Sequence, residues 1–324
     1  MKKNLAEHWL DQMELPVIAA PMFLVSGPEL VAACCKNGII GSFPAPNARP
    51  IEVLDEWMGY LNEELRIFRE ENPKQKIAPW AMNVVAHSSY ERIEDELKLI
   101  QKHKPELVIT AVGNPKRYVE VVHEYGGLVF SDVSDVSFAR KAAKAGSDGL
   151  ILISAGSGGH SGTINNFAFV DMVRKFWDGY IILAGGISTG DGILSAQAIG
   201  ADFAYLGTRF IPAKESMANN DYRQMLIDSD YNDIMYTDAF SGVNANILVP
   251  SILKAGLDPK NLKKKETIDF NSFHSEPKLW RDIWSAGHGV GTIQEVESTK
   301  SIIEKLKHEY KKACQRMNVT NRWT

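Results

Sequence analysis

Eight continuously apolar runs alternate with helix-like segments along the first 210 residues of this 324-residue chain. Parallel strands that are buried on both faces give such continuous runs, whereas half-exposed strands alternate apolar with polar residues. Eight β-α units in succession favour a closed barrel over an open sheet. The sequence therefore predicts the α/β class and a (β/α)8 TIM barrel, with strands at residues 15–22, 38–43, 77–85, 107–113, 127–132, 149–153, 180–187 and 203–210.

The segments between the runs have the apolar periodicity of helices, as Ile93, Leu97 and Ile100 show in one of them. An open doubly wound sheet is the alternative arrangement of these units. It is disfavoured because no Gly-x-Gly-x-x-Gly motif follows the first run. Helices are predicted at residues 28–36, 50–69, 91–102, 115–123, 135–145, 167–176, 191–199 and, closing the chain, 295–313.

The regular alternation stops after Phe210. Residues 212–290 contain a helical piece at 222–228 and several irregular stretches with glycine. We expect this part to be a smaller, mainly helical insertion after strand eight, packed over the barrel mouth as a substrate lid. The predicted domain division is a barrel from residues 1–211 and 291–324, and an insertion from residues 212–290.

Composition restricts the class of partner. The formal net charge is -4, which gives no electrostatic reason to expect nucleic acid or an anionic membrane surface as partner. No run reaches the roughly 18 apolar residues of a membrane helix, and the first residues lack the apolar core of a signal peptide. Three cysteines, with Cys34 next to Cys35, do not suggest a disulfide framework. We expect a cytoplasmic protein without a metal site, since no Cys or His cluster has metal-ligand spacing.

One glycine-rich stretch follows the sixth run directly. It reads Ser-Ala-Gly-Ser-Gly-Gly-His-Ser-Gly over residues 154–162. Glycine lets a backbone approach a ligand closely, and His160 can exchange protons near neutral pH. A histidine between glycines can also merely hydrogen-bond its own loop. Because the active site of a barrel lies at the carboxyl ends of its strands, we predict that His160 takes part in catalysis or substrate binding.

Two further glycine turns follow the last two runs. Gly185-Gly186 comes after the seventh run and Gly207-Thr208 after the eighth. In α/β barrels these two loops commonly form a phosphate site, where backbone N–H groups and a helix N-terminus face the anion. Either turn by itself could equally be a tight connection between a strand and a helix that binds no ligand. Together they predict a phosphate site for flavin mononucleotide, a sugar phosphate or a nucleotide.

Four spaced motifs resemble those of the nitronate monooxygenase family, formerly called 2-nitropropane dioxygenase. The resemblance covers about residues 15–290 and implies an FMN-dependent barrel with an added substrate domain. It also implies oxidation of alkyl nitronates, or of nitroalkanes, by O2 to a carbonyl compound and nitrite. The motifs are Ala20-Pro21-Met22, Ala155-Gly156-x-Gly158-Gly159-His160-x-Gly162, Ala184-Gly185-Gly186-Ile187 and Gly207-Thr208-Arg209-Phe210.

Related members of this superfamily leave an alternative open. Flavin-dependent enoyl-acyl carrier protein reductases and NADH:quinone reductases share the glycine-rich motif and its histidine. An NAD(P)H-dependent flavin reductase that acts on a quinone or an enoyl thioester is therefore the first alternative. A barrel isomerase or synthase without flavin and a flavin-binding protein without turnover are the others. A homodimer is compatible with each of them.

The resemblance also implies residue roles. His160 would face the substrate, as a base that takes the α-proton of a nitroalkane or as a cation that holds a nitronate. Some members carry a lysine near the end of strand five, where this chain has Asp132, and a carboxylate there could not pair with an anionic flavin. The implied FMN site is formed by Ala20, Pro21, Met22, Asn83, Gly158, Gly159, Ala184, Gly185, Gly186, Gly207 and Thr208.

Overall fold

The computed structural model describes residues 8–263 and 281–319. Eight parallel strands close into a barrel in the order β1-β2-β3-β4-β5-β6-β8-β9, which confirms the predicted fold. Each strand pairs with the next in parallel register, and β9 closes the barrel by pairing with β1. The strands are β1 (Val17–Ala19), β2 (Ile40–Pro44), β3 (Trp80–Val85), β4 (Leu107–Ala111), β5 (Leu128–Val133), β6 (Gly149–Ile153), β8 (Tyr180–Ala184) and β9 (Phe203–Leu206).

Both faces of these strands are buried, which accounts for their continuously apolar sequences. Alternate residues point into the barrel, where Ile18, Phe130, Ile151, Ile182 and Phe203 pack in one cluster. The intervening residues face outward and pack against the helices. The barrel interior is therefore a core rather than a channel.

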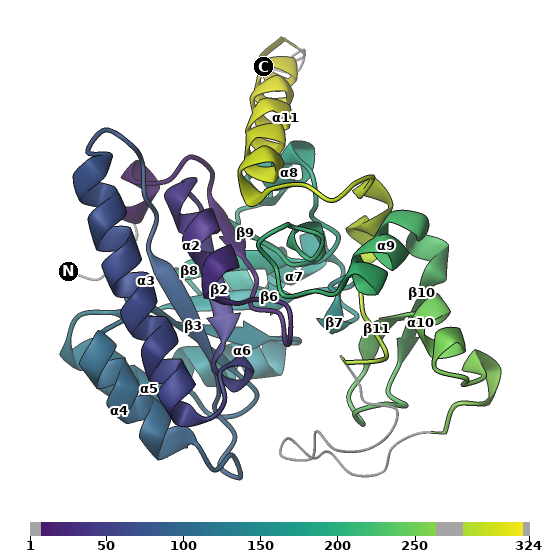
Figure 1. Ribbon diagram of the computed structural model, residues 1–324, viewed down its shortest axis with the longest axis horizontal. Helices are drawn as coiled ribbons and strands as arrows, with labels where there is room; N and C mark the ends of the chain where they lie inside the picture. Colours follow the sequence, from purple (N-terminus) through teal and green to yellow (C-terminus); the bar gives the residue numbers. More distant parts are fainter. Residues whose placement is uncertain (1–7, 264–280, 320–324) are drawn as a thin grey trace.

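Seven helices alternate with the strands, as predicted. On α3, for example, Leu54, Met58, Leu61 and Leu65 form the buried stripe. Helices α3, α4 and α5 lie together on the left side of Figure 1. The helices are α2 (Pro28–Lys36), α3 (Ile51–Glu71), α4 (Ile93–His103), α5 (Lys116–Glu124), α6 (Val136–Lys144), α7 (Asn166–Arg174) and α8 (Gly190–Ala198).

Several strands end earlier than the sequence predicts. The eighth predicted strand, residues 203–210, ends at Leu206 and continues as the short 3-10 helix η2 (Thr208–Phe210). The seventh, residues 180–187, ends at Ala184 because Gly185 and Gly186 have φ values of 118° and 69°. A strand cannot continue through these left-handed conformations. The glycine turns therefore lie beyond the strand ends, at the barrel mouth.

The chain after β9 contains a small sheet that the sequence did not predict. Besides α9 (Asn220–Asp228) and α10 (Val249–Lys254), it contributes the strands β10 (Ile234–Thr237) and β11 (Ala245–Leu248). The third strand, β7 (Gly159–His160), belongs to the glycine-rich stretch and pairs with β11. These elements gather on the right side of the barrel (Figure 1). The predicted histidine thus lies in a sheet shared by the barrel loop and the insertion.

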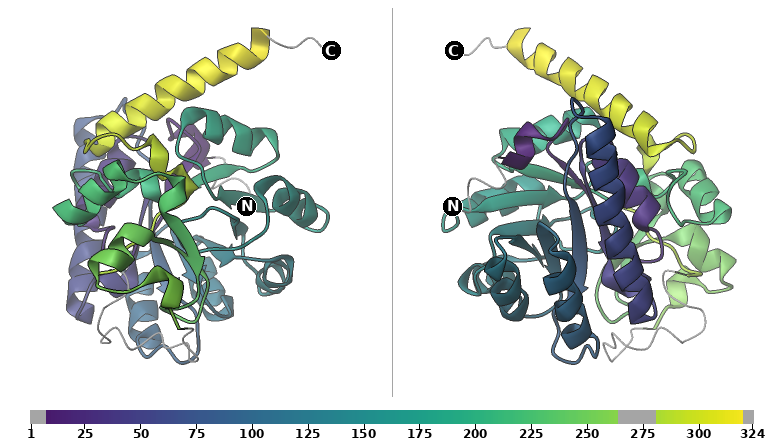
Figure 2. Two further views of the ribbon diagram at one scale, coloured as in Figure 1. Left: turned by 90° about the vertical axis from the view of Figure 1, so that its right-hand side faces the viewer. Right: turned by 60° about the vertical axis from the view of Figure 1, so that its left-hand side comes forward.

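The last helix, α11 (Thr299–Val319), lies across the outside of the barrel, and its C-terminal end extends past the body (Figure 2). It begins later than the predicted 295–313 because Glu215 accepts hydrogen bonds from the Thr299 N–H and hydroxyl, both at 2.9 Å. An acceptor at this position satisfies the first helical N–H groups. Of the predicted domain segments, residues 1–7, 264–280 and 320–324 lie outside the described residues. Within the described ranges, no helix combines the length and apolarity needed to cross a membrane.

Candidate active site

Three glycine-containing segments meet at the C-terminal ends of the strands. The carbonyl oxygen of Gly156, after β6, accepts a hydrogen bond from the Gly186 N–H at 3.2 Å, after β8. The same oxygen accepts from the His288 N–H at 2.9 Å, at the start of the 3-10 helix η5 (His288–Thr292). Asn166, on α7, donates to the carbonyl oxygen of Gly185 at 2.9 Å. The structure thus joins the predicted sixth-strand and seventh-strand turns.

The turn after β9 joins the same group. The Thr208 hydroxyl oxygen accepts a hydrogen bond from the Gly287 N–H at 2.9 Å. A Cβ on Gly158 would lie 2.8 Å from the nitrogen of Gly287, so only glycine fits there. A Cβ on Gly207 would lie 3.6 Å from the Ala20 Cβ, which places the end of β1 beside the turn.

We call these turns, with Thr208, the cradle: residues 156–159, 185–186, 207–208 and 287. The cradle fits a phosphate group on two observations. Gly186 is exposed, and a Cβ there would meet nothing closer than 3.9 Å, so its backbone faces open space. The Thr208 oxygen accepts from Gly287 and keeps its own proton to donate.

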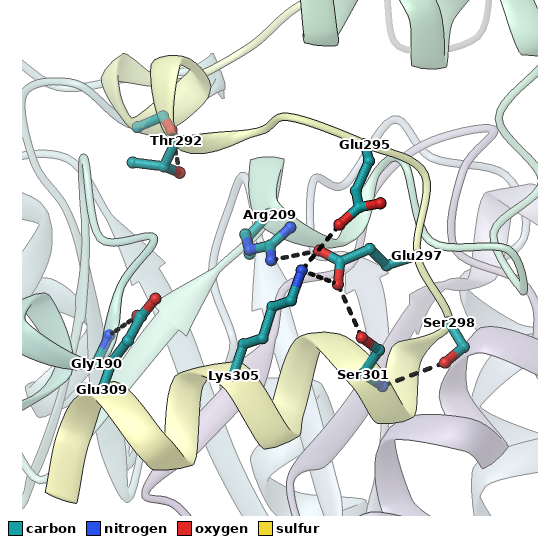
Figure 3. A network of polar contacts seen from close by, with 10 residues as sticks. Gly190, Arg209, Thr292, Glu295, Glu297, Ser298, Ser301, Lys305 and Glu309 are labelled. Atoms are coloured by element: carbon teal, nitrogen blue, oxygen red, sulfur yellow. Dashed lines mark hydrogen bonds and ion pairs between the residues drawn. The ribbon is translucent and has the colours of Figure 1, made fainter.

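The first N–H group of the helix after the seventh strand is hydrogen-bonded outside this site. The sequence suggested that the N-terminus of the helix after the seventh strand would face the phosphate. In the structure the first N–H of α8, on Gly190, donates to the carboxylate of Glu309 on α11 at 2.8 Å (Figure 3). That amide therefore serves helix packing and is not available to a ligand.

A buried ion-pair network supports the cradle from outside (Figure 3). Arg209, next to Thr208, pairs with Glu297 at 2.9 Å, and both side chains are buried. Lys305 also pairs with Glu297 at 2.6 Å, and Ser301 donates to it at 2.8 Å. Burial opposes the ionised form of Glu297, but the bonds from Lys305 and Arg209 lower its pKa to about 2. The network thereby ties the turn after β9 to α11.

His160 lies where the barrel loop meets the insertion. Its backbone pairs with Ala245 of β11, and its Nε2 lies 2.9 Å from the Ser241 hydroxyl oxygen. That hydroxyl lies 3.0 Å from the Val243 carbonyl oxygen. If it donates there, the hydrogen of the imidazole sits on Nε2, an assignment inferred from the contacts. Burial lowers the pKa of His160 to about 4, so the ring is neutral at pH 7.

Asn83 and Asp132 stand apart from the cradle. Asn83, on β3, is buried and donates to the Ile109 carbonyl oxygen at 3.3 Å. Asp132, near the end of β5, has its pKa raised to about 7 by burial. The described contacts connect neither side chain to the glycine turns.

Four residues take part in this site through contacts that the sequence did not predict. Asn246, on β11, donates to the Ser157 carbonyl oxygen at 2.6 Å and is buried, so it holds the glycine-rich stretch in place. Gly287 and Asn166 complete the cradle contacts described above. Tyr205 lies inside the barrel on β9, below Gly207. The sequence around Asn246 and Gly287 shows no periodicity, and Asn166 directly precedes the predicted helix at 167–176. Tyr205 lies in an apolar run that is typical of a core strand.

A closed (β/α)8 barrel, with glycine turns gathered at the ends of its last two strands, defines the class of α/β-barrel enzymes whose site lies at that face. Within that class the chain belongs to the nitronate monooxygenase family, whose sequence profile matches residues 7–309. It is thus an oxidoreductase of a flavin-dependent family. Among the residues that the structure describes, no group of three or more His, Cys, Asp or Glu side chains is placed to hold a metal ion.

Individual relatives agree with this assignment. The chain is 26% identical over 290 residues to a nitronate monooxygenase of Paraburkholderia phytofirmans, covering 77% of each chain. It is 24% identical to a nitronate monooxygenase of Neurospora crassa, covering 95% of this chain and 93% of the relative. Among solved structures, FabK from Thermotoga maritima aligns with a TM-score of 0.78 and 26% identity, over 97% of this chain and 98% of that chain.

Proposed function

We propose that this protein binds FMN and oxidises alkyl nitronates with O2 to a carbonyl compound and nitrite. The observation that carries the proposal is the convergence of three glycine turns and Thr208 at the barrel mouth, with His160 one residue beyond Gly159. Family membership and the names of the relatives support it. When bound, the flavin would supply the electron transfer, and the protein would supply position and polarity.

The cofactor residues divide by what they offer. The cradle would hold the FMN phosphate through backbone N–H groups and the Thr208 hydroxyl. Ala20 and Met22 lie beside Gly207, and together with Pro21 they would pack against the ring. Asn83, Gly158, Gly159 and Ala184 would complete the contacts implied by the family resemblance. The insertion at residues 212–290 would cover the substrate, because its strand β11 carries the partner of His160.

The low pKa of His160 disfavours one of its two predicted roles and weakens the other. A ring with a pKa of about 4 is uncharged at neutral pH, which disfavours the cation role. A neutral ring held by Ser241 can accept a proton, but a pKa this low makes it a weak base. A nitronate has already lost its α-proton and needs no such base. We therefore propose that preformed nitronates are turned over faster than neutral nitroalkanes, by a cytoplasmic enzyme.

An aerobic assay tests this function. Purified protein with FMN, and without NADH, should release nitrite from propionate-3-nitronate or ethylnitronate. NADH consumption with a quinone or an enoyl thioester, without nitrite release, would establish the reductase instead. Protein that is colourless and remains so after FMN is added would contradict both flavin functions.

Replacement of His160 tests its role. In His160→Asn, we expect turnover of a neutral nitroalkane to fall by about 100-fold, the lower end for loss of a general base. Turnover of the preformed nitronate should fall much less, because no proton has to be removed. His308→Asn, which changes an exposed histidine on α11, is the control. Equal losses with the two substrates would show that His160 does not act as the base.

A further inference from the structure

Two polar atoms inside the barrel have no hydrogen-bond partner among the described residues. They are the Oδ1 of Asp132 on β5 and the hydroxyl of Tyr205 on β9, and both atoms are buried. Nearly all buried polar side-chain atoms in folded proteins are hydrogen-bonded, since an unpaired one costs free energy. Two such atoms inside the barrel therefore indicate that a bound molecule supplies their hydrogen-bond partners.

The two side chains face each other across the barrel. On β5, Asp132 is two residues beyond Phe130, and on β9, Tyr205 is two residues beyond Phe203. The rings of Phe130 and Phe203 lie in the barrel interior with their centroids 6.5 Å apart. Residues two apart on a strand point to the same side. Asp132 and Tyr205 therefore form the next layer of the interior, toward the strand ends.

Electrostatics agree with this placement. The pKa of Tyr205 is raised well above its ordinary value, first by burial and then by the charge of Asp132, so the two groups lie within electrostatic reach. Burial raises the pKa of Asp132, which favours the neutral, protonated form of its carboxyl.

The layer lies directly below the proposed cofactor site. Tyr205 precedes Gly207 of the cradle by two residues, and it is paired in register with Ile18, two residues before Ala20. Asp132 is partly exposed as a residue, although its Oδ1 is buried. An inward side chain near the carboxyl end of a closed barrel is reached by solvent through the mouth. The carboxyl of Asp132 therefore opens toward the mouth.

We propose that Asp132, in its neutral form, and Tyr205 form a hydrogen-bonding floor that contacts the ring of the bound flavin. Both groups can donate an O–H, and a flavin ring offers carbonyl oxygens and ring nitrogens as acceptors. The inference rests on the proposed function for the identity of the cofactor. It assigns a purpose to the buried carboxyl of Asp132 as a hydrogen-bond donor without charge.

If Asp132 and Tyr205 form this floor, removing either donor should weaken FMN binding without lowering the stability of the chain that lacks FMN. Removing an unpaired buried carboxyl relieves its desolvation, so the chain without FMN should become more stable. Removing a donor to the ring should weaken FMN binding, by about 3- to 10-fold for one hydrogen bond. A purely structural pair, bridged by a buried water, would instead lose stability when either member is changed, and FMN affinity would not follow.

The experiment uses the full chain with Asp132→Leu, Asp132→Asn and Tyr205→Phe. The readouts are the FMN dissociation constant, the visible spectrum of the bound flavin, and the melting temperature without FMN. We expect weaker binding and a shifted spectrum for Asp132→Leu and Tyr205→Phe, with a melting temperature at or above that of the wild type. Asp132→Asn keeps a neutral donor and should bind FMN within about threefold of the wild type.

Tyr118→Phe is the matched control, because Tyr118 is a buried tyrosine outside the barrel interior whose hydroxyl contacts the Val85 carbonyl oxygen. It should leave the FMN dissociation constant and spectrum unchanged. Unaltered FMN affinity and spectrum in Asp132→Leu and Tyr205→Phe would overturn the floor, while the wild type still binds FMN and releases nitrite. Failure of the wild type to bind FMN would instead overturn the proposed function itself.

Discussion

The two sides of the barrel mouth are built in opposite ways. In the cradle, Gly156, Gly287 and Thr208 already hydrogen-bond to one another or to neighbouring turns. On the floor, Asp132 and Tyr205 hold polar atoms with no partner among the described residues. The cradle is therefore complete as a structure before a ligand arrives. The floor becomes complete when a ligand supplies the missing partners, so changes on the two sides should affect stability and binding in different directions.

The largest effect is expected where the cradle is anchored to α11. Glu297→Gln removes the charge that balances buried Arg209, and breaking a buried pair in this way costs about 3–5 kcal/mol of the free energy of unfolding. FMN binding should weaken as well, because Arg209 adjoins Thr208. Chemical denaturation of the full chain measures the first quantity, and a flavin titration measures the second.

Glu295→Gln provides the matched control for that change. Glu295 pairs with the same Lys305 at 3.0 Å but is exposed, so its loss should cost less than about 1 kcal/mol. Equal stability losses in the two variants would mean that the buried pair does not anchor the cradle, and the contrast between cradle and floor would lose its structural basis.

The next prediction compares Gly185 and Gly186, to separate a steric collision of an added Cβ from the strain of a positive φ. A Cβ on Gly185 would lie 2.7 Å from the Ala155 carbonyl oxygen, whereas one on Gly186 would meet nothing closer than 3.9 Å. Both residues have positive φ, so alanine is strained at either position by about 1–2 kcal/mol. Gly185→Ala adds a collision with backbone and should raise the FMN dissociation constant by about 100-fold or more.

Gly186→Ala isolates the conformational strain within the protein, because its Cβ would meet no protein atom closer than 3.9 Å. We expect it to lower the free energy of unfolding without FMN by about 1–2 kcal/mol, and Gly185→Ala to lower it further. FMN affinity should fall in both variants, because the methyl added by Gly186→Ala would occupy the open space proposed for the phosphate. Equal stability losses in the two variants would show that close backbone approach is not what positions the cradle. Floor variants should differ from both, because they weaken binding without loss of stability.

The barrel could be predicted because its signal is repetitive. Each strand is a mainly apolar run that is buried on both faces, and α3 carries an apolar stripe that includes Leu54, Met58 and Leu61. Eight such strands in alternation with helices leave few possible arrangements. The glycine turns were also predicted, since glycine marks positions where a Cβ is excluded. Their actual place, just beyond the strand ends, depends on positive φ values such as that of Gly185, which a run of small residues does not reveal.

The parts that escaped prediction depend on contacts between distant segments. Strands β7 and β11 pair through two residues each, and so short a ladder leaves no alternation to detect. Asn246 contacts Ser157 across 89 residues of sequence. Tyr205 escaped for another reason: inside an apolar run, a tyrosine resembles core. Its unpaired hydroxyl is visible once the barrel closes.

The smallest effect concerns pH, where Asp132 and His160 act in opposite directions. The folded-state pKa of Asp132 is raised to about 7 from an ordinary value of 3.8, so its contribution to stability is fully present below about pH 4 and is lost as the pH rises toward 7. The pKa of His160 is lowered to about 4 from 6.5, so its contribution is present above about pH 6.5 and is lost as the pH falls toward 4.

Asp132→Asn abolishes the first of these titrations and leaves the second. Relative to the wild type, the variant should therefore gain stability between pH 4 and 7, by about 2 kcal/mol, because the carboxyl is partly exposed and keeps some hydration. Urea denaturation of both proteins without FMN, at several pH values in this range, measures the difference. A difference that stays constant across the range would show that Asp132 ionises as readily in the folded chain as in the unfolded one. The floor would then carry a negative charge at neutral pH, and it could not act as a neutral donor to the flavin ring.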